Sequence, residues 1–146
     1  MTTLIPEAHC SVEFHPSWPL TEGPGALSQP VGDSGGSVFL HYGSSSTLDR
    51  YVGGWQARYG DGAVVTTDAP AVTADGLEGR RVALALGEEA IHRMGAGRDV
   101  MPAQTLVCTG YTIASVPVLL GYLVPEATDA ALIEAAEAIL ASLRVT

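Results

Sequence analysis

The chain contains no lysine, and this absence excludes two kinds of chemistry. All seven basic residues among the 146 are arginines. A Schiff-base mechanism needs a lysine amine, and a P-loop needs a lysine beside its phosphates. Acidic residues bring the net charge to −9, whereas nucleic-acid binding needs clustered positive charge. We therefore expect no nucleic-acid partner, and the acidic balance fits a soluble protein or one that meets a basic partner.

Cysteine and long apolar runs are also scarce. Cys10 and Cys108 form no disulfide framework, and the strand pattern around Cys108 predicts a core position. The longest apolar run, Val116–Val124, is far shorter than the ~20 residues of a membrane-spanning helix, so no membrane span is expected. The N-terminus has neither the basic nor the apolar segment of a secretory signal. A cytoplasmic protein is the resulting expectation.

Apolar residues are nevertheless abundant enough, at 47%, for a buried core. We expect one domain, residues 1–146, because its length is ordinary for a single domain. Alternating or continuous apolar patterns predict strands, which are the segments 10–14, 37–42, 63–67, 79–86, 106–113 and 116–124. The last two predict a β-hairpin, and within 79–86 Val82, Leu84 and Leu86 share one face while Arg81 lies on the other.

Two helices are expected, at residues 46–59 and 128–144, each with one apolar stripe. The first begins at a capping-box pattern and ends at Gly60, and it contains Gly53-Gly54. That pair costs about 2 kcal/mol relative to Ala-Ala. We take this cost to indicate the close approach of another backbone, such as a strand.

These elements predict an α+β fold with an antiparallel sheet of about six strands and two packing helices. Segment 16–36 is rich in proline, glycine and serine and is expected to be a long loop. Segment 87–103 is expected to be irregular, with a short helix over 88–94. Both loops are candidates for function, since long loops in compact domains often carry it.

A protease-like motif occurs at residues 32–36, which read Gly-Asp-Ser-Gly-Gly. Ser34 and His9 have the chemistry of a nucleophile and a base. They lie too close in sequence for the two barrels of a trypsin-like protease, and the chain is too short to form both. We interpret the motif as a flexible turn that enters the next strand.

The histidines show no metal-binding spacing, so no metal or cofactor is expected. His92 could pair with Glu88 or Glu89 at helical spacing, which is more typical of a surface contact. The strand face of Arg81 is expected to be simply exposed, since arginine is rarely fully buried. The less favoured interpretation is that Arg81 lines a groove or pairs with a carboxylate such as Glu78 or Asp75.

Candidate contact residues follow from these patterns. Trp18 stands in the proline-rich loop, where a large aromatic side chain suits a contact. Met94 and Met101 lie in the irregular segment and suit an adaptable apolar surface. With Arg81 and His92 they complete the set of candidate contacts, whereas no catalytic residue is assigned.

The chain resembles the PsbP-like fold, shared with the yeast Ran-binding protein Mog and with small bacterial lipoproteins. The likeness lies in the Pro-Trp segment 14–18, the helix after the next strand, the Gly-Arg strand at 79–82, and the final hairpin and helix. The resemblance implies a non-catalytic module that binds another protein, such as an adaptor or chaperone, and a homodimer is compatible with it. No catalytic residues are implied.

An alternative hypothesis is a small enzyme or ligand-binding protein. Its pocket would lie between the sheet and loop 87–103, and His92, Glu88, Arg81 and Ser34 would be the residues to test. A closed polar pocket that brings two of them together would favour this alternative, whereas a shallow apolar groove would favour binding of a protein.

Overall fold

The computed structural model of the chain describes residues 2–93 and 97–146, with side chains for all of these except residues 89–93 and 97–101. The strands are β1 (Thr2–Ile5), β2 (Cys10–Glu13), β3 (Thr21–Gly23), β4 (Ala26–Pro30), β5 (Ser37–Tyr42), β6 (Ala63–Val72), β7 (Glu78–Leu86), β8 (Glu89–Arg93), β9 (Gly97–Met101), β10 (Gln104–Ile113), β11 (Val116–Pro125) and β12 (Arg144–Val145). The helices are α1 (Leu48–Tyr59) and α2 (Ala130–Ala141), with short 3-10 turns at Pro6–Ala8 and Gly60–Gly62.

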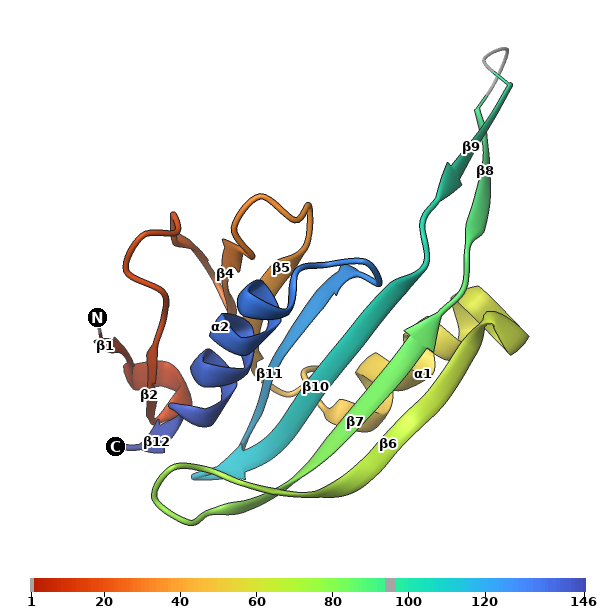
Figure 1. Cartoon of the computed structure of the whole chain (residues 1–146). Helices are drawn as coiled ribbons and strands as arrows, with labels where there is room; N and C mark the ends of the chain where they lie inside the picture. The colour runs from red at the N-terminus through yellow and green to blue at the C-terminus, as the bar shows by residue number, and fades with distance from the viewer. Residues whose placement is uncertain (1, 94–96) are drawn as a thin grey trace.

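One large antiparallel sheet organises the molecule (Figure 1). Its strand order is β3-β4-β5-β11-β10-β7-β6, so the central strands come from the C-terminal half of the chain. A small sheet of order β1-β2-β12 joins the two ends of the chain. The β8–β9 hairpin continues from the ends of β7 and β10 and projects away from the main sheet.

The central hairpin was correctly predicted from the sequence. β10 and β11 pair from Gln104↔Pro125 to Ile113↔Val116. Ala114 and Ser115 connect them, and both have positive φ, 49° and 68°. A two-residue connection with positive φ at both positions matches the right-handed twist of the paired strands.

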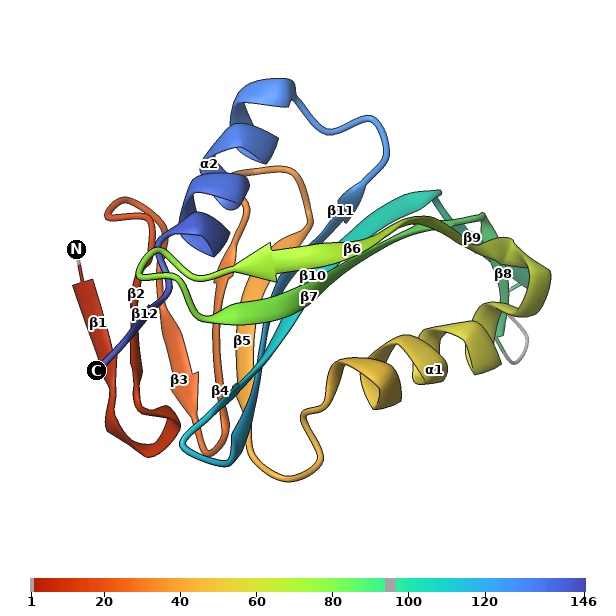
Figure 2. The same cartoon turned by 90° about the horizontal axis from the view of Figure 1, so that it is seen from below.

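The two helices cover opposite faces of the sheet (Figure 2). Thr47 caps the start of α1, and its hydroxyl accepts a hydrogen bond from the Arg50 amide. Gly60, which has a positive φ of 54°, caps the end of the helix. Asp129 caps the start of α2, and its carboxylate accepts a hydrogen bond from the Ala131 amide. Side-chain capping of free amides explains both starting points.

Each face of the sheet has its own apolar core. On the α2 face, Val38, Leu40, Val107, Val118 and Leu120 pack with the apolar side of α2 and with β2. On the α1 face, the buried residues are Phe39, Leu48, Val52, Val82, Leu84, Leu86, Leu106, Cys108 and Leu119. Because side chains alternate along a strand, neighbouring residues of β7 enter different cores.

The prediction of an α+β fold with about six strands is wrong, because the chain is mostly β and its main sheet has seven strands. Segment 16–36 is not one loop: it contains β3 and β4, which extend the sheet at one edge. Its prolines obscured this, since proline is depleted in strands, although Pro30 is the last residue of β4. Within segment 87–103, β8 and β9 pair as antiparallel strands, and β8 stands at residues 89–93 where a short helix was expected over 88–94. Residue 94 of that expected helix lies outside the described residues.

The second helix is also shorter than predicted. α2 ends at Ala141, and residues 144–145 form β12 beside β2 instead of a last helical turn. Across the described part of the chain, neither helix has the length and apolar character needed to cross a membrane.

Candidate functional site

A groove of about 440 Å³ runs along one side of α1, between the helix and the main sheet. Its wall on the helix is formed by Arg50, Tyr51, Gly54, Trp55 and Arg58. The opposite side and the floor come from the end of β5, the loop that follows it and β11, with His41, Ser45, Ser46 and Leu119. The groove is open to solvent.

The position of α1 follows from its apolar stripe. Leu48 and Val52 are buried against β7 and β10, which fixes the rotation of the helix about its axis. Arg50, Gly54 and Arg58 then form a row at i, i+4 and i+8, because residues four apart lie on the same side of a helix. This row faces the groove.

Aromatic rings form the inner side of the groove. Tyr51 lies 5.4 Å from Phe39 and 6.0 Å from His41, measured between ring centroids. Trp55 follows at 6.3 Å from Tyr51, and the guanidinium carbon of Arg58 lies 5.7 Å from the centre of the Trp55 ring. The contacts between rings hold Tyr51 and Trp55 in place. The cation–π contact holds the Arg58 guanidinium beside the Trp55 ring.

Burial changes the ionisation of two groups in this wall. It raises the pKa of Tyr51 to about 12 and lowers the pKa of His41 below its ordinary value. At neutral pH Tyr51 is therefore a neutral phenol and His41 a neutral imidazole. The permanent charge among the lining residues belongs to the two arginines.

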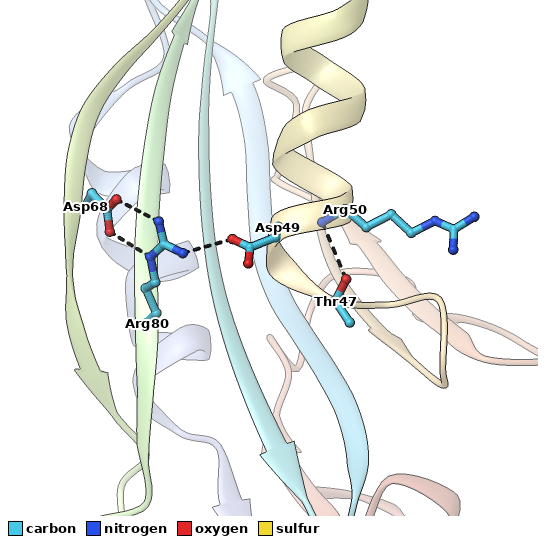
Figure 3. A network of polar contacts seen from close by, with 5 residues as sticks. All are labelled: Thr47, Asp49, Arg50, Asp68 and Arg80. Atoms are coloured by element: carbon cyan, nitrogen blue, oxygen red, sulfur yellow. Dashed lines mark hydrogen bonds and ion pairs between the residues drawn. The ribbon is translucent and has the colours of Figure 1, made fainter.

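Neighbouring charges on α1 are directed to different sides (Figure 3). Asp49 points to Arg80 on β7, with 2.8 Å between Oδ1 and the guanidinium, and Asp68 on β6 binds the same guanidinium through two 2.7 Å contacts. Arg50 points away from this network. Asp49, the acidic residue that directly precedes Arg50 in the sequence, is therefore directed away from the groove by its pairing with Arg80.

The glycine pair in α1 has no packing explanation within the described chain. No described atom outside the helix backbone and the adjoining residues lies within 4 Å of a Cβ placed on Gly53 or Gly54. The predicted approach of a strand to this pair is therefore not found. Gly54 instead lines the groove, so a side chain there would project into it.

Trp18 is held against the body of the protein. Its ring stacks on His15 with centroids 4.0 Å apart, and it packs on the core of the α2 face. The buried Gln29 fixes this segment by accepting from the His15 amide at 2.9 Å and donating to the carbonyls of His15 and Trp18 at 2.8 Å. Trp18 therefore has a packing role in this fold.

Arg81 lies on the strand face opposite Val82, as the strand pattern predicted, but this face is covered by α2 and is not simply exposed. Its guanidinium donates to both carboxylate oxygens of Glu137 on α2, at 2.7 Å and 2.6 Å, instead of pairing with Glu78 or Asp75. Tyr122 donates its hydroxyl to the same carboxylate at 2.6 Å. Burial would raise the pKa of Glu137, but these hydrogen bonds lower it below its ordinary value.

The other predicted contacts lie in the β8–β9 hairpin. His92 is in β8, with its backbone opposite Arg98, and Met101 is in β9 opposite Glu89. Their side chains, and the whole of Met94, lie outside the described residues. Their proposed contacts therefore stay predictions.

Ser34 closes its own turn. Its hydroxyl donates to the Val31 carbonyl at 2.7 Å and accepts from the Gly36 amide at 3.1 Å. This local use agrees with the interpretation of residues 32–36 as a turn. Among the described residues, no cluster of three potential metal-binding side chains is found.

The sequence patterns did not single out His41, Arg50, Trp55 or Arg58 as candidate contact residues. One usable signal was present, because two arginines stand four residues either side of a glycine that weakens the helix. Without the tertiary structure, nothing indicated that this side of α1 would border His41 on β5 and Leu119 on β11.

Comparison with known proteins places the fold only. No family model matches the chain, and no curated protein matches it. The chain is similar to a crystal structure from Bacteroides thetaiotaomicron VPI-5482, with a TM-score of 0.51 and 16% sequence identity. The likeness covers 99% of this chain and 48% of that protein, so the chain spans about half of its length.

Proposed function

We propose that this chain is a non-catalytic protein-binding module, of the adaptor or chaperone type that the PsbP-like resemblance implies. The observation that carries the proposal is the groove beside α1, which combines Tyr51 and Trp55 with Arg50 and Arg58. Aromatic residues and arginine are enriched at protein interfaces and dominate their binding energy.

The construction of the groove supports recognition of a partner. Its wall is a helix anchored by two buried side chains and its floor is the main sheet, so the contact residues are held on regular elements. Rigid presentation lowers the entropy lost on binding. An open groove also admits a chain segment along its length.

The polar groups of the groove support binding over catalysis. The described ring contacts of His41 are with Phe39 and Tyr51, and no described hydrogen bond joins it to a hydroxyl or a carboxylate. A nucleophile–base pair needs such a bond. Ser45 and Ser46 can instead serve as hydrogen-bonding groups at the rim.

Two of the residues that the alternative hypothesis assigns to a pocket make other contacts in the structure. Arg81 is bound by Glu137, and the Ser34 hydroxyl is bound within its own turn. Neither residue lines the groove beside α1. This leaves the groove beside α1 as the better supported site.

Site-specific photocrosslinking in the native host tests the proposal. A benzoyl-phenylalanine at position 54 should give a discrete adduct with another protein, because that side chain would enter the groove. The same residue at position 53, on the same helix but outside the groove lining, is the matched control. Equal adducts at both positions, or none at 54, would contradict the proposed site, and an adduct of twice the chain mass would identify a homodimer.

A further inference from the structure

β6 forms one edge of the main sheet (Figure 1). It is the last strand in the order β3-β4-β5-β11-β10-β7-β6, and within the described residues it pairs with β7 alone. It is ten residues long, whereas β3 at the opposite edge has three. A long edge strand presents a row of backbone N–H and C=O groups without a strand partner, and such a row is a template for pairing with another extended chain.

The side chains in the first half of β6 are also uncovered. Five consecutive residues, from Val64 to Asp68, are exposed, although neighbouring side chains point to opposite faces of a sheet. Val64, Val65 and Val72 are three of the five large apolar side chains that are exposed in the described part of the chain. Because β-branched side chains pack well against a neighbouring strand, this edge offers apolar contacts as well as main-chain pairing.

A β-bulge brings Val65 and Asp68 to the same face of the sheet. The register between β6 and β7 shifts between Val65 and Thr67. Val65 therefore pairs with Leu84 and Asp68 with Val82, two residues apart on β7. Leu84 and Val82 are both buried in the core of the α1 face. An apolar and an acidic side chain thus occupy adjacent positions on that face of the edge strand.

The charge on this face of the edge is negative. Asp68 and Asp49 share the Arg80 guanidinium, and Glu78 lines the same pocket as Asp49 and Arg80. Three carboxylates therefore lie near one guanidinium, and the side chain of Asp49 is 86% exposed. This local excess has the same sign as the net charge of −9. It favours a positively charged partner, because complementary potentials steer and select the binding partner.

A second copy of the chain fits this edge less well than a different partner. Two β6 strands that paired with each other would bring a second set of the same carboxylates to the interface, and like charges across strands are destabilising. Pro70 has no N–H to donate, and the bulge interrupts the regular ladder. Both features limit edge-to-edge pairing. The stretch available for pairing is residues 63–69, which suits a short segment.

We infer that the outer edge of β6 binds a short extended segment of a partner protein as an additional strand, and that this segment carries lysine or arginine. Its main chain pairs with residues 63–69. A basic side chain lies opposite Asp68 and an apolar side chain opposite Val65, since cross-strand neighbours approach to about 5 Å. No residue of β6 lines the groove beside α1, so this second surface goes beyond the function proposed for that groove.

Selection from a random peptide library displayed on phage tests this inference, with the full chain as bait. The selected peptides should be enriched in lysine or arginine alternating with apolar residues. Binding of a synthetic copy, measured by fluorescence anisotropy, should weaken with added salt. In an added strand alternate amides face β6 and the others face away. Methylation of one alternating set of peptide amides should therefore weaken binding roughly tenfold or more, whereas methylation of the other set should leave it unchanged.

Matched variants separate the edge from general effects of charge. Asp68→Asn should weaken peptide binding roughly tenfold, because a charge-assisted hydrogen bond is lost. Glu134→Gln makes the same change of net charge at an exposed position of α2 and should bind normally. Hydrogen exchange of the unaltered chain gives a readout that needs no variant. Bound peptide should slow exchange of the β6 amides and leave those of β3, at the other edge, unchanged.

Each contrary outcome identifies a different error. An empty selection, peptides without basic enrichment, or binding that survives methylation of either set of amides would overturn the inference. Peptides that lose binding in Gly54→Leu and keep it in Asp68→Asn would occupy the groove beside α1, which would overturn the edge site and support the function proposed above. A dimer in native mass spectrometry that Asp68→Asn strengthens would make a second copy the occupant and would also overturn the inference.

Discussion

The guanidinium of Arg81 on β7 donates two hydrogen bonds to the carboxylate of Glu137 on α2, of 2.7 Å and 2.6 Å. About a third of each side chain is exposed, at 31% and 34%. This ion pair links α2 to the sheet at the edge of the apolar core between them. The Tyr122 hydroxyl donates a hydrogen bond to the same carboxylate.

Removing one partner of this pair should destabilise the fold. Arg81→Met leaves the Glu137 carboxylate without its bidentate donor, and we expect the free energy of unfolding in urea to fall by about 1–3 kcal/mol. Arg80→Met is the matched control on the same strand. Its more exposed ion pairs should contribute less to stability, because solvent screens them, so an equal loss in both variants would contradict this account.

The same pair should make stability depend on acid pH. Burial alone would raise the folded-state pKa of Glu137, but hydrogen bonds from Arg81 and Tyr122 outweigh it and lower this pKa below its ordinary value of 4.5. A lowered pKa in the folded state stabilises it at pH values above 4.5, and this contribution is lost as pH falls through the folded-state value. The stability difference between the wild type and Glu137→Gln should therefore shrink as pH is lowered from 6 to about 3. A difference that stays constant over this range would contradict the prediction.

Glycine positions should respond to alanine in opposite directions. Gly54→Ala should raise the free energy of unfolding by about 0.5–1 kcal/mol, because it improves helix propensity in open space. Gly121→Ala on β11 should lower it by about 1–3 kcal/mol, because its Cβ would meet the Val107 carbonyl and Cys108 of the adjoining strand. Thermal and urea unfolding measure both, and a destabilising Gly54→Ala would show that the helix needs this glycine for its own packing.

Both thiols should be unreactive in the folded protein. Burial raises the pKa of Cys10 to about 11 and that of Cys108 to about 12, and only the thiolate is a good nucleophile. Ellman's reagent should label neither cysteine under native conditions at pH 8 and both in denaturant. Because the two lie in cores on opposite faces of the sheet, oxidation should give no intramolecular disulfide, and fast labelling of the native state would refute this.

Replacing the buried Gln29 should lower the stability of the fold, although its side chain carries no charge. Gln29→Leu leaves the His15 amide and two carbonyls without their partner, and we expect a loss of about 2–3 kcal/mol in urea unfolding. Gln56→Leu, an exposed residue of α1, is the control and should change stability by less than about 0.5 kcal/mol. Altered fluorescence of Trp18 in the first variant would report release of the segment, and equal stability of both variants would contradict the assigned role.

Local sequence signals located most of the regular elements. The hairpin of β10 and β11, both helices and the two faces of β7 were predicted because their periodicity depends on neighbouring residues. β3, β4 and the β8–β9 hairpin were missed. Their glycines and prolines are typical of loops, and these strands depend on pairing with a distant or adjacent strand that the local pattern does not reveal.

The candidate site could not be predicted in the same way. The sequence alone determined the row of Arg50, Gly54 and Arg58 on one side of α1, since helical geometry fixes it. Tertiary packing decided that this row borders His41 and Leu119, residues on β5 and β11, and that Asp49 is drawn off to Arg80. The reason is physical: a helix pattern specifies which residues share a face, but only burial of Leu48 and Val52 against particular strands specifies what that face meets.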